Sequence, residues 1–212
     1  MMLGVGGSAD DRRAVASAGR DQAPATKHAS ARESGQDLGV SQPLRLLVDT
    51  RLHSEELARF ETNVVRGPYR DDCAIWVGAI GGNGYGRFWV RRGGGERIMV
   101  RANRYALAAA RDGEALEPSV RALHWCDNPI CVRVSLPGET GLLHVIGGTQ
   151  RDNMEMMGRA RRGGGRPAVR RGIAGLAQRR ARAAALRAAV RDGWDADGVA
   201  EALLTLREPT LR

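Results

Sequence analysis

The stretch that decides the expected fold is residues 123–131, Leu-His-Trp-Cys-Asp-Asn-Pro-Ile-Cys. Residues 120–126 have the composition of a strand, and the Asp-Asn-Pro that follows is a strong turn signal. A second apolar segment, residues 142–146, is expected to return as a strand. Thr149 followed three residues later by Asp152 then indicates the capped start of a helix. The expected order is therefore strand, cysteine-containing loop, strand and helix.

The cysteines and one histidine form a candidate metal-binding set. Cys126 and Cys131 lie in the same loop, His144 lies in the returning strand, and Cys73 comes from a segment upstream. Three cysteines are an odd number in a chain without a secretory signal, so a disulfide framework is not expected. Three cysteines and one histidine complete the ligand set of a tetrahedral structural zinc ion. The spacing alone also fits three buried free cysteines and an unrelated surface histidine.

The segment upstream of this loop is expected to contain three strands and a helix. Residues 74–77 and 85–90 have strand composition and flank an Asn83-Gly84 pair, which favours a hairpin turn. A second glycine-rich turn separates them from a third strand at 97–100. Residues 102–110 are expected to form a helix that ends at an Asp-Gly pair.

These segments resemble the HNH endonucleases of phages and actinobacteria, members of the ββα-metal group related to the His-Cys box homing endonucleases. The resemblance rests on the 123–131 stretch, on His144, and on Gly-Thr-Gln-Arg-Asp-Asn-Met at 148–154. Upstream, Cys-x2-Trp at 73–76 and Gly-Tyr-Gly-Arg at 84–87 match two further elements in the family's order. The resemblance implies an α+β fold with a zinc-stabilised ββα-metal core (HNH, or His-Me finger) that contains an antiparallel hairpin.

The same resemblance implies roles for individual residues. His124 corresponds to the general base, Asn153 to a ligand of the catalytic divalent ion, Mg²⁺ or another, and Arg87 to an arginine that steadies the phosphate or the leaving group. The structural zinc ligands correspond to Cys73, Cys126, Cys131 and His144. Phosphodiester hydrolysis needs a base for the attacking water and positive charge near the leaving oxygen, so the division of roles is chemically coherent. Taken alone, His124 also fits a structural histidine, and Asn153 a helix surface residue.

One loop departs from the family pattern. After Cys131 the family continues Val-Asn-Pro, whereas here Val132 is followed by Arg133, and residues 133–141 correspond to an insertion. Arg133 thus stands at the position of the middle asparagine of the HNH motif. This change supports an alternative function, a catalytically weak or inactive zinc-stabilised DNA-binding regulator. A third alternative is a zinc module for protein contacts. The positive charge of the C-terminal residues argues against it, because that charge favours a nucleic-acid partner.

Charge divides the chain into three expected parts. The chain carries 33 Lys and Arg against 24 Asp and Glu, a formal net charge of +9, which favours nucleic acid as the partner. Residues 158–212 hold thirteen basic and five acidic residues, while residues 43–157 are nearly neutral. We expect a disordered leader at 1–42, which has almost no large apolar side chains, an endonuclease domain at 43–162 and a basic all-α tail at 163–212.

The tail is similar to the C-terminal DNA-binding part of serine recombinases. A Gly-Arg-Pro arm at 165–167 precedes a helical segment at 168–190, and a second helix is expected at 197–204, with a third starting near Glu208. The resemblance implies a helix-turn-helix-like module on double-stranded DNA, with contacts from Arg166, Arg170, Arg171, Arg207 and Thr210. An Arg-rich solvated helix with non-specific affinity for phosphates is the alternative.

Other classes of protein are not favoured by the sequence. No segment has the apolar length of a membrane span or the pattern of a signal peptide, so a soluble protein in the cytoplasm of a bacterial or phage-infected cell is expected, with no membrane partner. Six of the nine aromatic residues lie between positions 76 and 125, where the core is therefore expected. A homodimer is one arrangement that the sequence leaves open.

Overall fold

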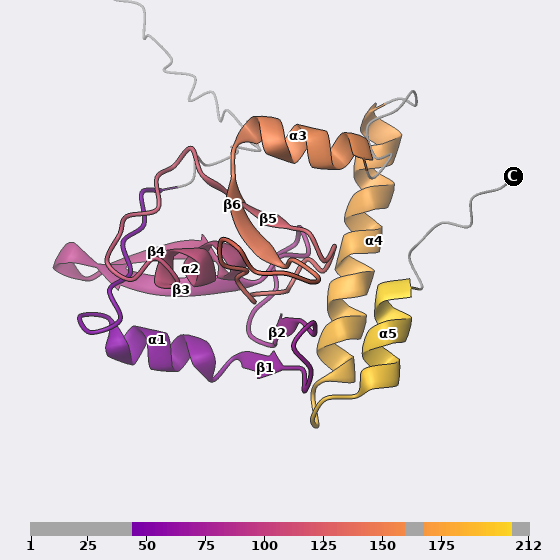
Figure 1. Cartoon of the computed structure of the whole chain (residues 1–212), viewed down its shortest axis with the longest axis horizontal. Helices are drawn as coiled ribbons and strands as arrows, with labels where there is room; N and C mark the ends of the chain where they lie inside the picture. The colour runs from indigo at the N-terminus through magenta and orange to yellow at the C-terminus, as the bar shows by residue number, and fades with distance from the viewer. Residues whose placement is uncertain (1–43, 160–167, 205–212) are drawn as a thin grey trace, which may run out of the picture. The chain divides into compact units, whose positions relative to one another are not determined.

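The computed structural model describes residues 44–159 and 168–204, which form a mixed α+β fold (Figure 1). The strands of these ranges form antiparallel two-stranded hairpins. They are β1 (Val64–Arg66), β2 (Ala74–Trp76), β3 (Arg87–Arg92), β4 (Glu96–Arg101), β5 (Arg121–His124) and β6 (Val145–Gly148). The helices are α1 (Ser54–Glu61), α2 (Ala102–Ala109), α3 (Gln150–Arg159), α4 (Ala168–Ala189) and α5 (Ala196–Leu204). The expected α+β class is confirmed.

The first hairpin differs from the expectation. The strand at 74–77 does not pair with 85–90 around Asn83-Gly84, because β2 pairs with β1, a strand that sequence patterning did not reveal. β1 is only three residues long, too short for its alternation to be recognised. Asn83-Gly84 belongs to a local turn instead, in which the Gly81 N–H donates to the Tyr85 carbonyl at 2.8 Å.

The longest hairpin is formed by β3 and β4. Its turn is Gly93–Gly95, where Gly94 and Gly95 have φ angles of 70° and 87° that glycine adopts at little cost. The strands alternate, with Phe88, Val90 and Val100 buried on one face. This hairpin therefore contributes one face to the core and leaves the other face outward.

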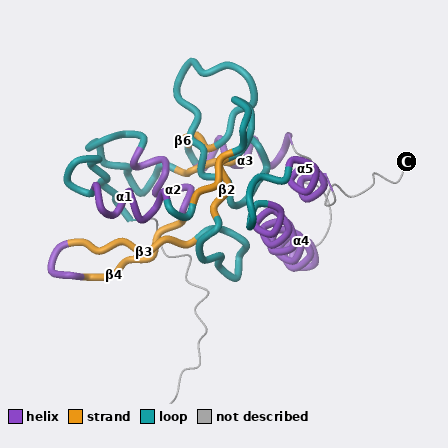
Figure 2. The backbone as a smooth tube through the Cα atoms, turned by 90° about the horizontal axis from the view of Figure 1, so that it is seen from below, coloured by secondary structure: helices purple, strands orange, loops and turns teal. Residues whose placement is uncertain are grey.

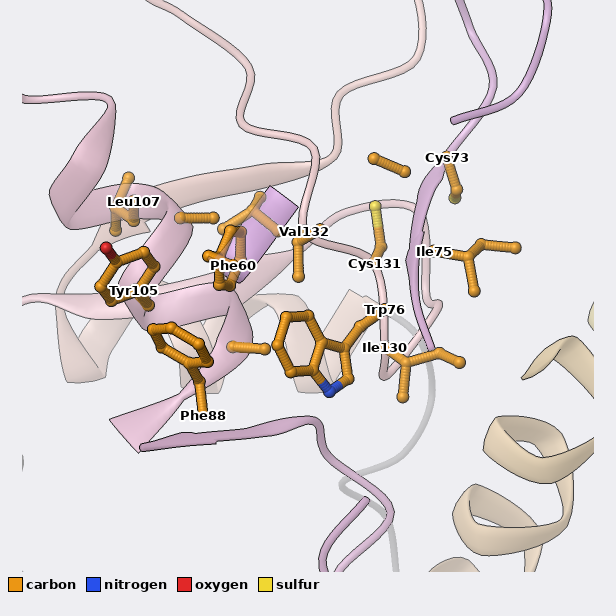
Figure 3. Packing of buried hydrophobic residues seen from close by; sticks show 14 of the residues in the cluster. Phe60, Cys73, Ile75, Trp76, Phe88, Tyr105, Leu107, Ile130, Cys131 and Val132 are labelled. Carbon is orange, nitrogen blue, oxygen red and sulfur yellow. The ribbon is translucent and has the colours of Figure 1, made fainter. Parts of the chain in front are cut away.

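The centre of the core is a cluster of four aromatic rings (Figure 3). Phe60 of α1 lies 4.9 Å from Trp76 and 4.6 Å from Tyr105 of α2, and Phe88 lies 4.6 Å from Tyr105, all measured between ring centroids. Such offset and edge-on pairs add to the stabilisation from burial alone. The core thus lies where the aromatic residues predicted it, although Trp89 and Trp125 of the same region remain 40% and 42% exposed.

A buried arginine ties the N-terminal segment to the rest of the core. The Arg104 guanidinium, on α2, donates to the backbone carbonyls of Leu44 and Glu117 at 2.9 Å and also to those of Leu116 and Val120. Burial lowers the pKa of Arg104, with the Arg121 charge adding to the effect. One side chain therefore joins the backbone at Leu44 to the 116–120 segment through four hydrogen bonds.

We predict that Arg104→Ala destabilises the protein by about 3–5 kcal/mol, because it removes four hydrogen bonds from one buried guanidinium, each contributing about 1 kcal/mol. Chemical denaturation of the two proteins measures this difference. Arg51→Ala is the matched control, since Arg51 is exposed and should change the free energy of unfolding by less than about 0.5 kcal/mol. Equal effects of the two substitutions would contradict the structural role of Arg104.

The segment that carries the expected chemistry has the expected order of strand, loop, strand and helix. β5 pairs with β6 in the register His124 with Val145, and β6 begins three residues later than expected. The start of α3 is confirmed as a capped helix. The Thr149 N–H and hydroxyl donate to Asp152 Oδ2 at 2.7 and 2.8 Å, and the Asp152 N–H donates to Thr149 Oγ1 at 3.1 Å.

The two C-terminal helices pack against each other, as both views of the chain show (Figures 1 and 2). Apolar residues of both helices belong to the same buried cluster as the aromatic rings. They are Ala183 and Leu186 of α4, Val190 directly after it, and Val199 and Ala202 of α5. These two helices lie where the sequence predicts them. The leader at 1–42, Arg166, Arg207, Thr210 and the third helix expected near Glu208 lie outside the described residues.

None of the helices in the described part of the chain is long and apolar enough to cross a membrane.

Candidate metal centre and its surroundings

The four residues predicted to bind zinc come together in the structure. Cys73 directly precedes β2, Cys126 and Cys131 flank the loop after β5, and His144 directly precedes β6. Their sulfur and nitrogen donor atoms all lie within 4.8 Å of one another. His144 Nδ1 lies 3.6 Å from both Cys73 Sγ and Cys131 Sγ. The sequence prediction of this ligand set is therefore confirmed as a spatial cluster.

The spacing of the donor atoms matches that of a tetrahedral site. With metal–sulfur bonds of about 2.3 Å and a metal–nitrogen bond of about 2.1 Å, tetrahedral angles place a sulfur and a nitrogen about 3.6 Å apart. Thiolate and imidazole donors are the set that zinc takes in structural sites. The cluster can thus hold a metal ion such as zinc, with no ligand position left for a substrate.

The loop between the two cysteines is shaped by its own polar groups. Asn128 is fully buried, and its Oδ1 accepts the Ile130 N–H at 3.0 Å. Asp127 adopts a φ of 60°, in the left-handed region that Asp and Asn tolerate better than most residues. The turn directs both cysteines inward, and Figure 3 shows Cys131 and Cys73 on neighbouring segments beside the aromatic core. The Asp-Asn-Pro turn predicted from the sequence therefore forms the loop that carries two residues of the Cys3His cluster.

The segment at 133–141, expected as an insertion, supports the cluster from the other side. The Arg133 guanidinium donates to the Asp72 carbonyl at 3.0 Å and pairs with Glu139 at 3.1 Å, which closes this segment on itself. Ser135 Oγ accepts the backbone N–H of His144 at 3.0 Å. Arg133, at the position of the family's middle asparagine, thus holds the loop next to Cys73 in place.

The three thiols interact strongly with one another. Hydrogen bonds from Cys126 and Cys131 lower the pKa of Cys73 far below its usual value, against the opposing effect of burial. A hydrogen bond with Cys131 lowers the pKa of Cys126, but the bond with Cys73 and burial raise it more, to about 12. Burial, followed by the bonds to Cys126 and Cys73, raises the pKa of Cys131 well above its usual value. Metal binding would have to displace these protons, and its affinity must therefore depend on pH.

The position of His144 suits a metal ligand. Its side chain is fully buried, Nδ1 faces the sulfurs, and Nε2 is buried without a hydrogen-bond partner in the described part of the chain. A buried polar cluster of this kind is costly unless it is paired. A metal ion bound at Nδ1 would join the buried ring to the sulfurs, and Nε2 would then carry the ring proton.

His124, the predicted general base, ends β5 and points toward α2. Asn103 Nδ2 lies 2.8 Å from His124 Nε2 and also donates to the Ala122 carbonyl at 3.1 Å. A carbonyl can only accept, so the contact with Ala122 fixes the orientation of the amide, and Nε2 must accept its second proton. Neutral His124 therefore carries its own proton on Nδ1, which is buried without a partner among the described residues.

The surroundings of His124 are cationic and aromatic. Tyr85 lies 5.9 Å from the His124 ring between centroids, and the guanidinium groups of Arg101 and Arg179 lie 4.6 and 5.2 Å from the centre of the Tyr85 ring. Burial lowers the pKa of His124 to about 4, with Arg101 adding to this and the Cys73 charge opposing it. The imidazole is therefore neutral at pH 7.

No hydrogen bond among the described residues joins the side chains of His124 and Asn153. His124 faces α2, whereas Leu123, the preceding residue, lies with Asp152 and Met156 of α3 around a shallow pocket. Asn153 is half-buried on α3, and its Nδ2 lies 3.9 Å from Met157 Sδ. The pairing of these two residues in one catalytic site stays a prediction.

Arg87 lies on the outward face of β3, directly across from Arg101 of β4. A side chain at Gly81 would collide with the Arg87 guanidinium, so the glycine leaves room for it. Sequence patterning identified Arg87 but missed Asn103, Arg101 and Arg179. The signal for Asn103 was a lone amide within an alanine-rich helix, while the two arginines depend on tertiary contacts that no local pattern reveals.

Part of the basic helix α4 is bound to the rest of the protein. Arg182 Nη1 donates to the Asp127 carbonyl and carboxylate at 3.1 and 3.2 Å, and Arg179 Nη1 donates to the Asn83 carbonyl at 3.3 Å. Arg180 contacts the Gly82 carbonyl. Arg170 and Arg171, predicted to contact DNA, lie in the first turn of α4, and their side chains are outside the described part. Arginines 179 and 180 thus join α4 to the Gly81–Gly84 turn, and Arg182 joins it to the loop between Cys126 and Cys131.

We predict that Gly84→Ala weakens the docking of α4. Gly84 has a φ of 81°, and a Cβ there would lie 3.0 Å from the backbone carbon of Arg179. Gly138→Ala is the matched control, because its φ of 83° imposes the same strain with nothing within 4 Å. The Gly84 variant should lose about 1–3 kcal/mol more in the free energy of unfolding than the Gly138 variant. Equal losses would mean that only backbone strain is involved.

Comparison with known proteins gives one similarity without a functional name. The chain is 29% identical over 87 residues to Protein 7.7 of Escherichia phage T7, which is 41% of this chain and 55% of that protein. The chain therefore spans about half the length of this relative. No protein-family model matches the chain, and no solved structure matches it.

Proposed function

We propose that the protein is a zinc-stabilised, metal-dependent endonuclease that hydrolyses phosphodiester bonds of double-stranded DNA. The observation that carries the proposal is the Cys3His cluster at the end of β5. His124 lies two positions before the ligand Cys126, and the Arg101 guanidinium lies over the neighbouring Tyr85 ring. A structural metal of this kind organises small cores that burial alone would leave marginal. The HNH resemblance of residues 73–161 supplies the reaction.

The proposed chemistry assigns His124 as the general base for the attacking water. Arg101 and Arg179, close to Tyr85 beside His124, supply positive charge for the scissile phosphate, together with Arg87 across the strand from Arg101. A divalent ion such as Mg²⁺, held by Asn153 and by the DNA itself, would stabilise the leaving oxygen. Base action requires that Nε2 be released from Asn103, since that hydrogen bond occupies its lone pair.

One observation favours a second function, a zinc-stabilised DNA-binding regulator without catalysis. Both ring nitrogens of His124 are occluded, one by the hydrogen bond with Asn103 and the other by burial. Arg133 at the family's asparagine position fits the same alternative. The two functions share the metal centre and the DNA partner and differ only in whether the bond is cut.

The experiment that separates them incubates the zinc-loaded full chain with supercoiled plasmid, with and without Mg²⁺, and measures binding to a labelled duplex in parallel. The endonuclease proposal expects nicked or linear DNA that appears only when Mg²⁺ is present. Binding without any cleavage over a range of divalent ions would favour the regulator. Neither binding nor cleavage would contradict both.

A further inference from the structure

The outward face of the β3–β4 hairpin carries a concentrated and unneutralised positive charge. Three cross-strand pairs make up this face, which we call the ribbon face: Arg87 with Arg101, Trp89 with Met99, and Arg91 with Arg97. Facing pairs in an antiparallel register place their side chains on the same side. The ribbon face therefore displays four arginines, one tryptophan and one methionine, and no acidic residue.

None of the four arginines of the ribbon face forms an ion pair within the described part of the chain. The neighbouring Arg92 differs, because it pairs with Glu56 at 2.7 Å and faces the other way. Like charges directly opposite each other destabilise a hairpin, and two of the three pairs here are of that kind. Folding alone gives no reason for this arrangement, whereas an anionic partner would make each of these charges favourable.

The two apolar side chains on this face are also exposed. Trp89 and Met99 retain 40% and 39% of their surface, although they sit side by side at the centre of the ribbon. The Arg97 guanidinium lies 4.9 Å over the Trp89 ring, which orients it without neutralising it. Arg101 is held in the same way, 4.6 Å over the Tyr85 ring. Ring stacking thus pre-organises two of the four cations.

The shape of the hairpin fits a duplex groove. Arg87 and Arg91 are four residues apart on β3, which corresponds to about 14 Å along the strand at about 3.4 Å per residue. A two-stranded ribbon fits the major groove, which is about 12 Å wide. At the tip, nothing lies within 4 Å of a Cβ built at Gly94 or Gly95, so nearby protein does not obstruct approach there. Figure 2 shows the two strands running side by side to this tip.

We infer that the ribbon face is the surface that binds the DNA backbone, with Arg91 and Arg97 contacting phosphates and Trp89 holding Arg97 in position. The inference rests on the proposed function for the identity of its partner, duplex DNA. It places the main binding surface in the part of the chain whose net charge is nearly zero. The positive charge that would bind DNA is concentrated on one face of one hairpin. Arg101 connects this face to His124, because its guanidinium lies over the Tyr85 ring, which is beside the His124 ring.

The test measures binding of a fluorescent duplex by anisotropy at several salt concentrations, using the full chain with His124→Ala so that the DNA stays intact. Arg91→Gln/Arg97→Gln removes two charges from the ribbon face. The matched control, Arg45→Gln/Arg66→Gln, removes two charges from exposed ion pairs elsewhere. Circular dichroism and zinc content establish that every variant is folded.

The ribbon variant should bind about tenfold or more weakly near 0.1 M salt, and its plot of log affinity against log salt should be shallower by about 1.8, the value for two phosphate contacts. The control should keep the original slope. Trp89→Ala should weaken binding with the slope nearly unchanged. An unchanged slope in the ribbon variant, or an equal loss in the control, would overturn the inference. If the wild-type protein binds DNA through the ribbon face but does not cleave plasmid, the result would support this inference and contradict the endonuclease proposal.

Discussion

His144→Ala is expected to abolish zinc binding and the cooperative unfolding transition of the protein. His144 is fully buried and is the one nitrogen donor among three sulfurs. Structural zinc contributes about 10–16 kcal/mol of apparent binding free energy in zinc-finger peptides at pH 7. Typical domains have about 5–15 kcal/mol of total stability, so loss of the ion should exceed what the remaining core supplies.

The measurement is thermal unfolding by circular dichroism, together with zinc content, for the wild type and the variant. His53→Ala is the matched control, because His53 is a half-buried histidine outside the cluster whose Nδ1 contacts the backbone of Asp49, at 3.0 Å from its N and 3.2 Å from its O. It should keep its zinc and lose no more than about 1 kcal/mol. A His144→Ala protein that unfolds at the wild-type temperature would contradict the metal-dependent fold.

Acidification should produce the same loss in the wild type. Burial and hydrogen bonds to the other thiols raise the pKa of Cys131 in the metal-free cluster, and the pKa of Cys126 is raised to about 12. Zinc binding therefore releases protons, and protons compete more effectively as the pH falls. The zinc contribution to stability should decrease as the pH is lowered, with zinc release and unfolding occurring together. Release of zinc without any loss of structure would contradict this linkage.

The second large effect is expected from His124→Ala, which should reduce the rate of plasmid cleavage by about 10²–10⁴-fold, the usual contribution of a general base. Zinc content should be unchanged, because His124 lies outside the set of four ligands. DNA affinity should also be unchanged, since the imidazole is neutral at pH 7. His124→Gln should be equally slow, whereas His53→Ala should cut at the wild-type rate. Equal cutting by wild type and His124→Ala would remove His124 from the mechanism.

The Cys3His cluster could be predicted from the sequence because its signal is chemical and largely local. Cys126 and Cys131 share a loop whose Asp-Asn-Pro turn was evident, and His144 follows on the returning strand. Cys73 is distant in sequence, but soft donors are few in this chain, so its participation could be inferred from the ligand count that zinc requires. The capped start of α3 was predictable for a similar reason, since Thr149 and Asp152 interact within one turn.

The strand pairing could not be predicted in the same way. The Asn83-Gly84 pair is a good turn signal, but β1 takes the pairing edge of β2, and a three-residue strand leaves no periodic pattern to detect. The ribbon face depends on the register of β3 with β4. Net charge summed along the sequence hides it, because the acidic residues of the same segment offset the four arginines in the sum although none of them is on this face.

The contacts of the basic helix also required the structure. The sequence placed the positive charge of the C-terminal segment on DNA, yet Arg179 and Arg182 of α4 contact Asn83 and Asp127. Helix composition gives no information on which side chains face a neighbouring loop. Additional DNA contacts remain predicted in the tail, at Arg166, Arg170, Arg171, Arg207 and Thr210. The salt dependence of the ribbon variant separates the contribution of the ribbon face from theirs.

The most direct test of the account measures metal content and plasmid cleavage on a single preparation of the full chain, purified without added metal. The account predicts one zinc ion per chain, retained through dialysis, and cleavage that begins only when Mg²⁺ is added. A folded protein without bound zinc would contradict the role of the Cys73, Cys126, Cys131 and His144 cluster. Zinc-loaded protein that leaves plasmid intact at every Mg²⁺ concentration would contradict the proposed endonuclease.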